Sequence, residues 1–255
     1  MTGSRLAVAG LFAATFLTVL IVTLPASVVS AAIRNATNGR MELANCHGTI
    51  WRGTAIPVLH RQKSEEGFLQ FGRLQWDVSI KSLLVLQPRI VLSWVSESQI
   101  PPMEARLSFG QLSVDNLYLP LSASLLGETS AHLRPLGLGG RIIVKSNALS
   151  ISNQELQGAL TADWMDAYSA LSHLKPLGHY RFTIRGAGKG GDLSLDTISG
   201  ILILKGNGRF DMAGAMSLEG YSQAAEGQQE KLRELLNNLG PETAPGRHAF
   251  SLKMK

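Results

Sequence analysis

The chain has 255 residues with a formal net charge of +5, and hydrophobic residues make up 45% of it against 17% for charged ones. This balance excludes a highly charged disordered chain and indicates a folded body. Because lysine and arginine are scattered without a run of four, we predict no nucleic-acid binding. The single cysteine, Cys46, excludes an intramolecular disulfide and a metal site built on several cysteines.

The N-terminal segment is the most apolar part of the chain. Residues 6–33 carry no charge, and residues 6–24 are almost wholly apolar, which suffices for a helix to cross roughly 30 Å of hydrocarbon. We predict a transmembrane anchor at 6–33, with the helix exit marked by Pro25. A cleaved signal peptide is the alternative, since Arg5 is a basic flank and residues 30–32 are small, but signal cores span only about 7 to 15 residues.

The orientation of this anchor follows weakly from charge. Arg5 and the α-amino group on one side are nearly balanced by Arg34 and Arg40 on the other. The short N-terminal flank favours a cytoplasmic start. We therefore predict a cytoplasmic flank at 1–5 and a β-rich domain outside the cytoplasm at 34–255, a choice that rests partly on the family resemblance given below.

Beyond residue 40 apolar residues alternate with a period near two, which is typical of half-buried strands. Short turns rich in Gly, Asn and Asp separate the alternating segments, so the fold class is mainly β, a curved antiparallel sheet following the anchor. The segments at 79–86 and 201–204 are predicted to be strands with apolar neighbours on both faces. Strands are predicted at 69–78, 90–94, 142–144, 149–151, 180–184, 201–204, 212–218 and 250–254.

Two short helices are predicted within this β-rich domain. Residues 163–174 place apolar side chains near helical spacing, and residues 226–239 place leucines at i, i+3, i+4 and i+7. The second helix is expected to stop at Gly240-Pro241.

An internal repeat relates two adjoining segments. The motif His-Leu-Arg-Pro-Leu-Gly at 132–137 recurs as His-Leu-Lys-Pro-Leu-Gly at 173–178, which defines repeat units near 132–170 and 173–211. Two copies cannot close a propeller, so we expect two similar β units side by side in one sheet. A chance match of so short a motif is the alternative.

Motifs that suggest chemistry have simpler explanations. Residues 186–191 match G-x-G-x-x-G, but an alternating strand follows them rather than a helix, which favours a hairpin turn. The six histidines do not fall at metal-ligand spacing. Cys46 and His47 are strand neighbours that point to opposite faces, and Asp192 and Asp196 fit a solvated strand edge better than a glycosidase pair. We predict no enzyme, and no catalytic, cofactor-binding or metal-binding residues.

Six segments carry a resemblance to a known family, and together they span most of the chain. They are Leu24-Pro25-Ala26-Ser27, Gly48-Thr49-Ile50-Trp51-Arg52-Gly53-Thr54-Ala55, Leu74-Gln75-Trp76, Leu177-Gly178-His179-Tyr180, residues 200–208 and residues 232–240. The sequence resembles the type II secretion system protein N family. The resemblance implies a non-enzymatic, single-pass protein of the bacterial inner membrane whose β-rich domain at 34–255 lies in the periplasm. Its implied role is to support the assembly of a type II secretion system or the export of folded proteins across the outer membrane. It implies other secretion subunits as partners and leaves the oligomeric state open.

Trp51 and Arg52 are the candidate partner-contact residues. The competing interpretation makes Trp51 an anchor that holds the first strand against the core, with Gly48 and Gly53 permitting tight turns. An alternative function is a membrane-tethered periplasmic domain that handles lipid or another envelope substrate, because a curved sheet could shelter acyl chains along an apolar face.

Overall fold

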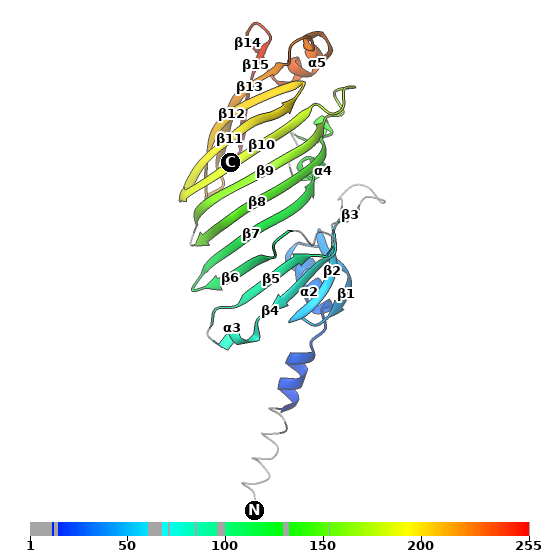
Figure 1. Cartoon of the computed structure of the whole chain (residues 1–255), viewed down its shortest axis with the longest axis vertical. Coiled ribbons are helices and arrows are strands. Elements are labelled where there is room, and N and C mark those ends of the chain that lie inside the picture. Colours follow the sequence, from blue (N-terminus) through cyan, green and yellow to red (C-terminus); the bar gives the residue numbers. More distant parts are fainter. Residues whose placement is uncertain are drawn as a thin grey trace, which may run out of the picture. The chain divides into compact units, whose positions relative to one another are not determined.

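The computed structural model in Figure 1 describes residues 12, 15–60, 68–70, 72–84, 86–95, 100–129, 133–152 and 154–254. The chain divides into two compact units, Met1–Pro102 (unit 1) and Met103–Lys255 (unit 2). Both units are mainly β, as predicted, and the strand pairs described within each are antiparallel.

Unit 1 begins with helical segments and continues into a small sheet. A helical segment at 15–23 is followed by α2 (Ser27–Ala36). The sheet has the order β1–β2–β4–β5, with β3 paired to the free part of β2. Its elements are β1 (Met41–Gly48), β2 (Arg52–His60), β3 (Phe68–Gln70), β4 (Leu74–Val78), α3 (Ile80–Leu84) and β5 (Arg89–Trp94).

The predicted span at 6–33 lies partly outside the described residues. Its described part is not one continuous helix, because residues 24–26 separate the segment at 15–23 from α2. Within the part of the chain that the structure describes, no helix is both long and apolar enough to cross a membrane.

The core of unit 1 lies between α2 and the sheet. Ala26, Leu43, Ala55 and Trp76 are buried together, and apolar side chains of α2 pack against them. The hydroxyl of Ser30 on α2 donates to the carbonyl of Leu43 (2.8 Å) and accepts from its amide (3.0 Å). The polar contact and the apolar packing together fix α2 on β1.

Unit 2 is an antiparallel meander in the order β6–β7–β8–β9–β10–β11–β12–β13–β15–β14, and Figure 1 shows these strands as one continuous row. Its elements are β6 (Met103–Ser108), β7 (Gln111–Ser122), α4 (Ser124–Thr129), η1 (Arg134–Leu136), β8 (Gly139–Ser152), β9 (Glu155–Tyr168), β10 (Gly178–Gly188), β11 (Gly190–Gly200), β12 (Leu202–Asp211), β13 (Met216–Ala224), α5 (Gln229–Leu239), β14 (Glu242–Ala244) and β15 (Arg247–Met254).

The register of unit 2 separates an apolar face from a polar one, because side chains alternate along each strand. On the apolar face one row of cross-strand partners contains Leu119, Val144, Ala162, Phe182, Leu195, Gly206, Gly220 and Phe250. The row beside it on the polar face contains Tyr118, Lys145, Thr161, Thr183, Ser194, Asn207, Glu219 and Ser251. The core built on Ile142, Trp164, Tyr180 and Leu195 lies on the apolar face.

α5 covers one end of that apolar face. Leu232, Leu235 and Leu236 are buried against Leu177, Leu202 and Ala224. The predicted helix at 226–239 is confirmed, with its start at Gln229 and its end at Leu239 before Gly240.

The predicted helix at 163–174 is wrong. Residues 163–168 belong to β9, and residues 169–177 form no helix. Strand pairing on both sides overrides the helical spacing, since β9 pairs with β8 and β10. The Trp164 indole donates to the carbonyl of Gly139 (2.9 Å), and Arg181 donates to Asp163 (2.6 Å). Both contacts require the extended chain.

Several predicted strands are confirmed, with changed bounds. The segments at 142–144 and 149–151 form one strand, β8, and residues 212–215 form a turn before β13. The strand assumed at 79–86 is wrong, because α3 occupies Ile80–Leu84. The glycine-rich segment at 186–191 is the β10–β11 hairpin, as predicted.

The described part of the repeat corresponds to two neighbouring hairpins. The first motif copy precedes β8–β9 and the second precedes β10–β11, and β9 pairs with β10. The two units differ in where their glycines lie, since Gly158 is inside β9 whereas Gly200 ends β11.

Candidate functional site

Trp51 and Arg52 lie in and beside the turn that joins β1 to β2. The Thr49 hydroxyl accepts hydrogen bonds from the amides of Trp51 (3.3 Å) and Arg52 (3.2 Å), and the Thr49 amide donates to the Arg52 carbonyl (2.9 Å). Gly48 has φ +89°, and a Cβ there would lie 2.4 Å from that same carbonyl oxygen. The turn therefore requires glycine at 48 and a hydroxyl acceptor at 49.

Trp51 fastens the helical segment at 15–23 to this turn. Its indole Nε1 donates to the carbonyl oxygen of Ile21 at 2.9 Å. In an α-helix the partner of that carbonyl would be the amide of residue 25, but residue 25 is proline and has no N–H. The indole therefore satisfies an acceptor that Pro25 leaves open.

The turn makes two further backbone contacts with the end of the helical segment. The Ile50 amide donates to the Leu24 carbonyl and the Ala26 amide donates to the Gly48 carbonyl, both at 3.0 Å. These bonds flank a β-bridge between Pro25 and Thr49. Carbonyls at a helix C-terminus lack intrahelical partners, so the turn acts as the cap of this helix.

Arg52 directs its charge toward the neighbouring strand β4 rather than into the core. Its Nε lies 2.7 Å from Oδ2 of Asp77, its register partner on β4, and the two side chains are 76% and 45% exposed. An ion pair this exposed contributes about 0–1 kcal/mol. The Arg52 guanidinium thus remains accessible for a contact outside the chain.

The structure brings the two predicted residues together and adds partners that the sequence reasoning missed. The sequence does contain a signal for Ile21, because Pro25 lies four residues later and leaves the Ile21 carbonyl without a helical donor. Asp77 carries no local signal, because its approach to Arg52 depends on the pairing of β2 with β4.

Cys46 is not poised as a nucleophile. It is half-buried, and its thiol donates to the carbonyl of Leu43 at 3.2 Å. Burial raises the pKa of the Cys46 thiol, with a lowering contribution from Ser30 and a raising one from Glu42. His47 is exposed on the same strand, and the register between β1 and β2 shifts between Ala44 and His47.

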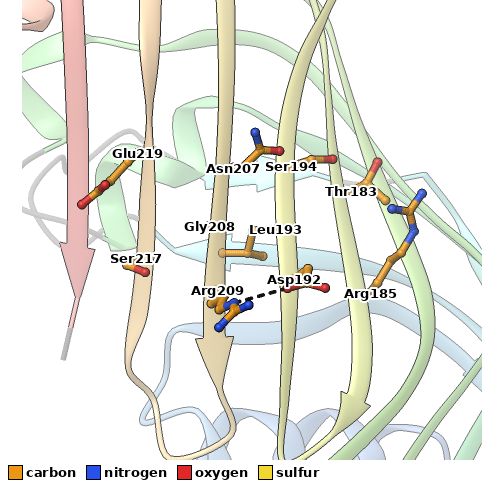
Figure 2. Close-up of a pocket in the computed structure, with 10 residues that line it drawn as sticks. All are labelled: Thr183, Arg185, Asp192, Leu193, Ser194, Asn207, Gly208, Arg209, Ser217 and Glu219. Atoms are coloured by element: carbon orange, nitrogen blue, oxygen red, sulfur yellow. Dashed lines mark ion pairs between the residues drawn. The ribbon is translucent and has the colours of Figure 1, made fainter.

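The hairpin strands of unit 2 hold a shallow pocket of about 490 Å³ among polar side chains, shown in Figure 2. Arg185, Asp192 and Arg209 are register partners across it, and the Asp192–Arg209 ion pair (3.6 Å) is 76% and 84% exposed. Charges of both signs are solvated there. The pocket is lined by Thr183, Arg185, Asp192, Leu193, Ser194, Asn207, Gly208, Arg209, Ser217 and Glu219.

Among the described residues, no group of three or more His, Cys, Asp or Glu side chains is arranged to hold a metal ion. His132 lies outside those residues.

Comparison with known protein families identifies the family to which the chain belongs. The model of the family described as "Type II secretion system (T2SS), protein N" matches residues 39–251, a range that includes both Trp51 and Arg52. Searches of curated proteins and of solved structures gave no significant match. Because the family model covers most of the sequence, the chain belongs to the type II secretion system protein N family.

Proposed function

We propose that this protein is a non-enzymatic, single-pass subunit of the bacterial inner membrane that supports the assembly of a type II secretion system or the export of folded proteins across the outer membrane. Residues 1–5 form the cytoplasmic flank, and within the segment predicted at 6–33 the part before Pro25 forms the anchor, because α2 packs on the sheet of unit 1. Residues 34–255 stand in the periplasm and contact other subunits of the system.

The observation that carries the membrane part of this proposal is the exposed apolar surface of the helical segment at 15–23. Phe16, Leu17 and Leu20 are 65%, 56% and 49% exposed, and the segment contains no charged residue. An apolar helix that its own fold leaves uncovered is stable in lipid rather than in water. Its carbonyl at Ile21 is nevertheless satisfied, as the membrane environment requires.

A reporter fusion tests the topology. An enzyme that is active only in the periplasm, fused after Lys255, should be active, and the same enzyme fused before Met1 should be inactive. The intact mass of the purified protein should include the N-terminus. A mass that begins near Ala32 would identify a cleaved signal peptide and overturn the anchor.

Co-purification tests the role in secretion. The tagged full-length protein, gently solubilised from inner membranes, should enrich other type II secretion subunits, as identified by mass spectrometry. Absence of these subunits from the captured fraction would contradict the proposal.

Arg52 and Trp51 are the proposed partner contact. Arg52 presents an exposed guanidinium at the point where the helical segment meets the sheet, so subunits whose own helices lie beside the anchor can reach it. Arg52→Glu should reduce co-purification severalfold. Arg73→Glu, an exposed arginine of unit 1 outside this turn, is the matched control and should leave it unchanged.

The second candidate function is the handling of lipid, and the apolar face of unit 2 favours it. Leu119, Val144, Ala162 and Phe182 form one row across four strands, and each is only half-buried. A face of this kind suits acyl chains. Mass spectrometry of the purified full-length protein should then detect bound phospholipid that Phe182→Asp removes and Thr183→Asp, on the polar face, retains. Equal lipid content in the two variants would exclude this face as the site.

A further inference from the structure

The connection between β4 and β5 holds two large apolar side chains in solvent. Ile80, the first residue of α3, is 52% exposed, and Leu86 is 76% exposed. Leu86 also has φ +56°, a left-handed backbone conformation that a branched residue rarely adopts. A strained backbone conformation at a residue whose side chain is largely exposed indicates a functional constraint rather than a folding one.

Hydrogen bonds hold this connection in place, so the exposure of these side chains is a built feature. The Ser82 hydroxyl donates to the Ser79 carbonyl (2.6 Å) and accepts from the Arg89 amide (2.9 Å). The Gln87 amide donates to the Ser82 carbonyl at 3.0 Å. The backbone on both sides of Leu86 is thereby tied to the ends of β4 and β5.

The connection lies at the end of unit 1 where the helical segment at 15–23 arrives. The Val78 amide donates to the Trp51 carbonyl at 2.6 Å, while the Trp51 indole bonds Ile21. Figure 1 shows α3 and the helical segment at this same end of the unit 1 sheet. A membrane that contains the helical segment would therefore lie next to α3.

All charged residues of the connection between β4 and β5 are basic. Residues 79–89 contain Lys81 and Arg89 and no acidic residue, and both basic residues are exposed. Apolar side chains flanked by basic ones are typical of segments that lie in the headgroup region of anionic bilayers. A tryptophan such as Trp51 is also favoured at that depth.

We propose that this end of unit 1 docks onto an anionic phospholipid leaflet. Ile80 and Leu86 enter the boundary between headgroups and acyl chains, and Lys81 and Arg89 lie against lipid phosphates. The proposal rests on the proposed function, because the leaflet is the one that the anchor enters. Such docking holds unit 1 in a fixed orientation on the membrane and sets which of its edges faces a partner subunit.

Site-specific labelling of the full-length protein tests the proposal. In a Cys46→Ser background, an environment-sensitive fluorophore is placed in turn on Leu86→Cys, Val95→Cys and Leu20→Cys. Val95 is the matched control, since it is 50% exposed and follows the opposite end of β5. The proteins are placed in nanodiscs of phosphatidylethanolamine and phosphatidylglycerol and quenched with brominated lipid or with iodide.

Docking predicts that brominated lipid quenches the Leu86 label at least about threefold more than the Val95 label, and that iodide shows the reverse order. Equal quenching of these two labels, with the Leu20 label quenched by lipid, would overturn the docking while leaving the anchor intact. A Leu20 label that brominated lipid does not quench would contradict the anchor, and the docking with it.

A charge reversal provides a second measurement that does not depend on labelling Leu86. Lys81→Glu should reduce lipid quenching of a label on Ile80→Cys about twofold or more in nanodiscs that contain phosphatidylglycerol, and Arg73→Glu should not. Circular dichroism confirms that both variants are folded. Unchanged quenching in the folded Lys81→Glu variant would contradict the role of lipid phosphates.

Discussion

The indole of Trp51 donates its hydrogen bond to the carbonyl of Ile21, thirty residues earlier in the chain, at 2.9 Å. Pro25 removes the amide that would otherwise serve this carbonyl, so one residue of the β1–β2 turn completes the end of a helix. Unit 1 thereby holds the apolar segment at a defined point rather than through a free linker.

Trp51→Phe should loosen the helical segment without unfolding unit 1. Loss of a hydrogen bond that leaves a carbonyl unsatisfied costs about 1–3 kcal/mol, so amide exchange in residues 15–25 should accelerate about fivefold or more. Trp164→Phe removes a 2.9 Å indole bond in unit 2 and is the matched control. Exchange mass spectrometry in detergent should show no change in residues 15–25 for that control.

Gly48→Ala should destabilise unit 1 more than Gly39→Ala does. Both glycines have positive φ, +89° and +76°, but only at Gly48 would the new Cβ meet backbone, 2.4 Å from an oxygen. A Cβ at positive φ lowers the free energy of unfolding by about 1 kcal/mol at either site, and the clash at Gly48 lowers it by roughly 1–3 kcal/mol more. Equal losses of melting temperature for the two variants would show that the turn can relax.

The ion pair between Asp163 and Arg181 should make the stability of unit 2 depend on pH on the acid side. Hydrogen bonding to Arg181 lowers the pKa of Asp163, against a smaller opposing effect of burial. Because the folded-state pKa lies below the unfolded value of about 4, the stabilisation is complete above that value and is lost as pH falls through the folded pKa. Asp163→Asn should therefore reduce the fall in melting temperature of unit 2 between pH 6 and pH 2, as measured by thermal unfolding.

Arg181→Met should lower the stability of unit 2 by about 1.5–3 kcal/mol, since Asp163 is 10% exposed and would lose a charged hydrogen-bond partner. Arg209→Met breaks the exposed pair with Asp192 and should cost at most about 1 kcal/mol. Denaturant unfolding of the two variants compares them directly. A larger loss for Arg209→Met would contradict this order.

Tyr180 should resist alkaline titration. Burial raises the pKa of its phenol, which is 1% exposed and donates to the carbonyl of Leu202 at 2.9 Å. The stabilisation is complete below the unfolded value of about 10 and declines as pH rises from there toward the folded pKa. Absorbance of tyrosinate should show Tyr180 ionising only with unfolding, and Tyr180→Phe should remove that step.

Much of the fold could be predicted from local patterns. Alternation located most strands because side-chain direction in a strand is fixed by parity, and the leucines of α5 located that helix because its apolar stripe has helical period. The hairpin at 186–191 followed from the strand after it. The helix predicted at 163–174 was wrong because the spacing of Met165, Tyr168 and Leu171 fits the apolar stripe of a helix as well as it fits a strand.

The sequence by itself determined the β class of this protein, its apolar N-terminal segment and its family, since each depends on spacing or composition along the chain. Only the tertiary structure decided that β9 is extended through Tyr168, because hydrogen bonds to β8 and β10 outweigh a weak local preference. The same holds for the contacts of Trp51 with Ile21 and of Arg52 with Asp77, which join residues that no local pattern relates.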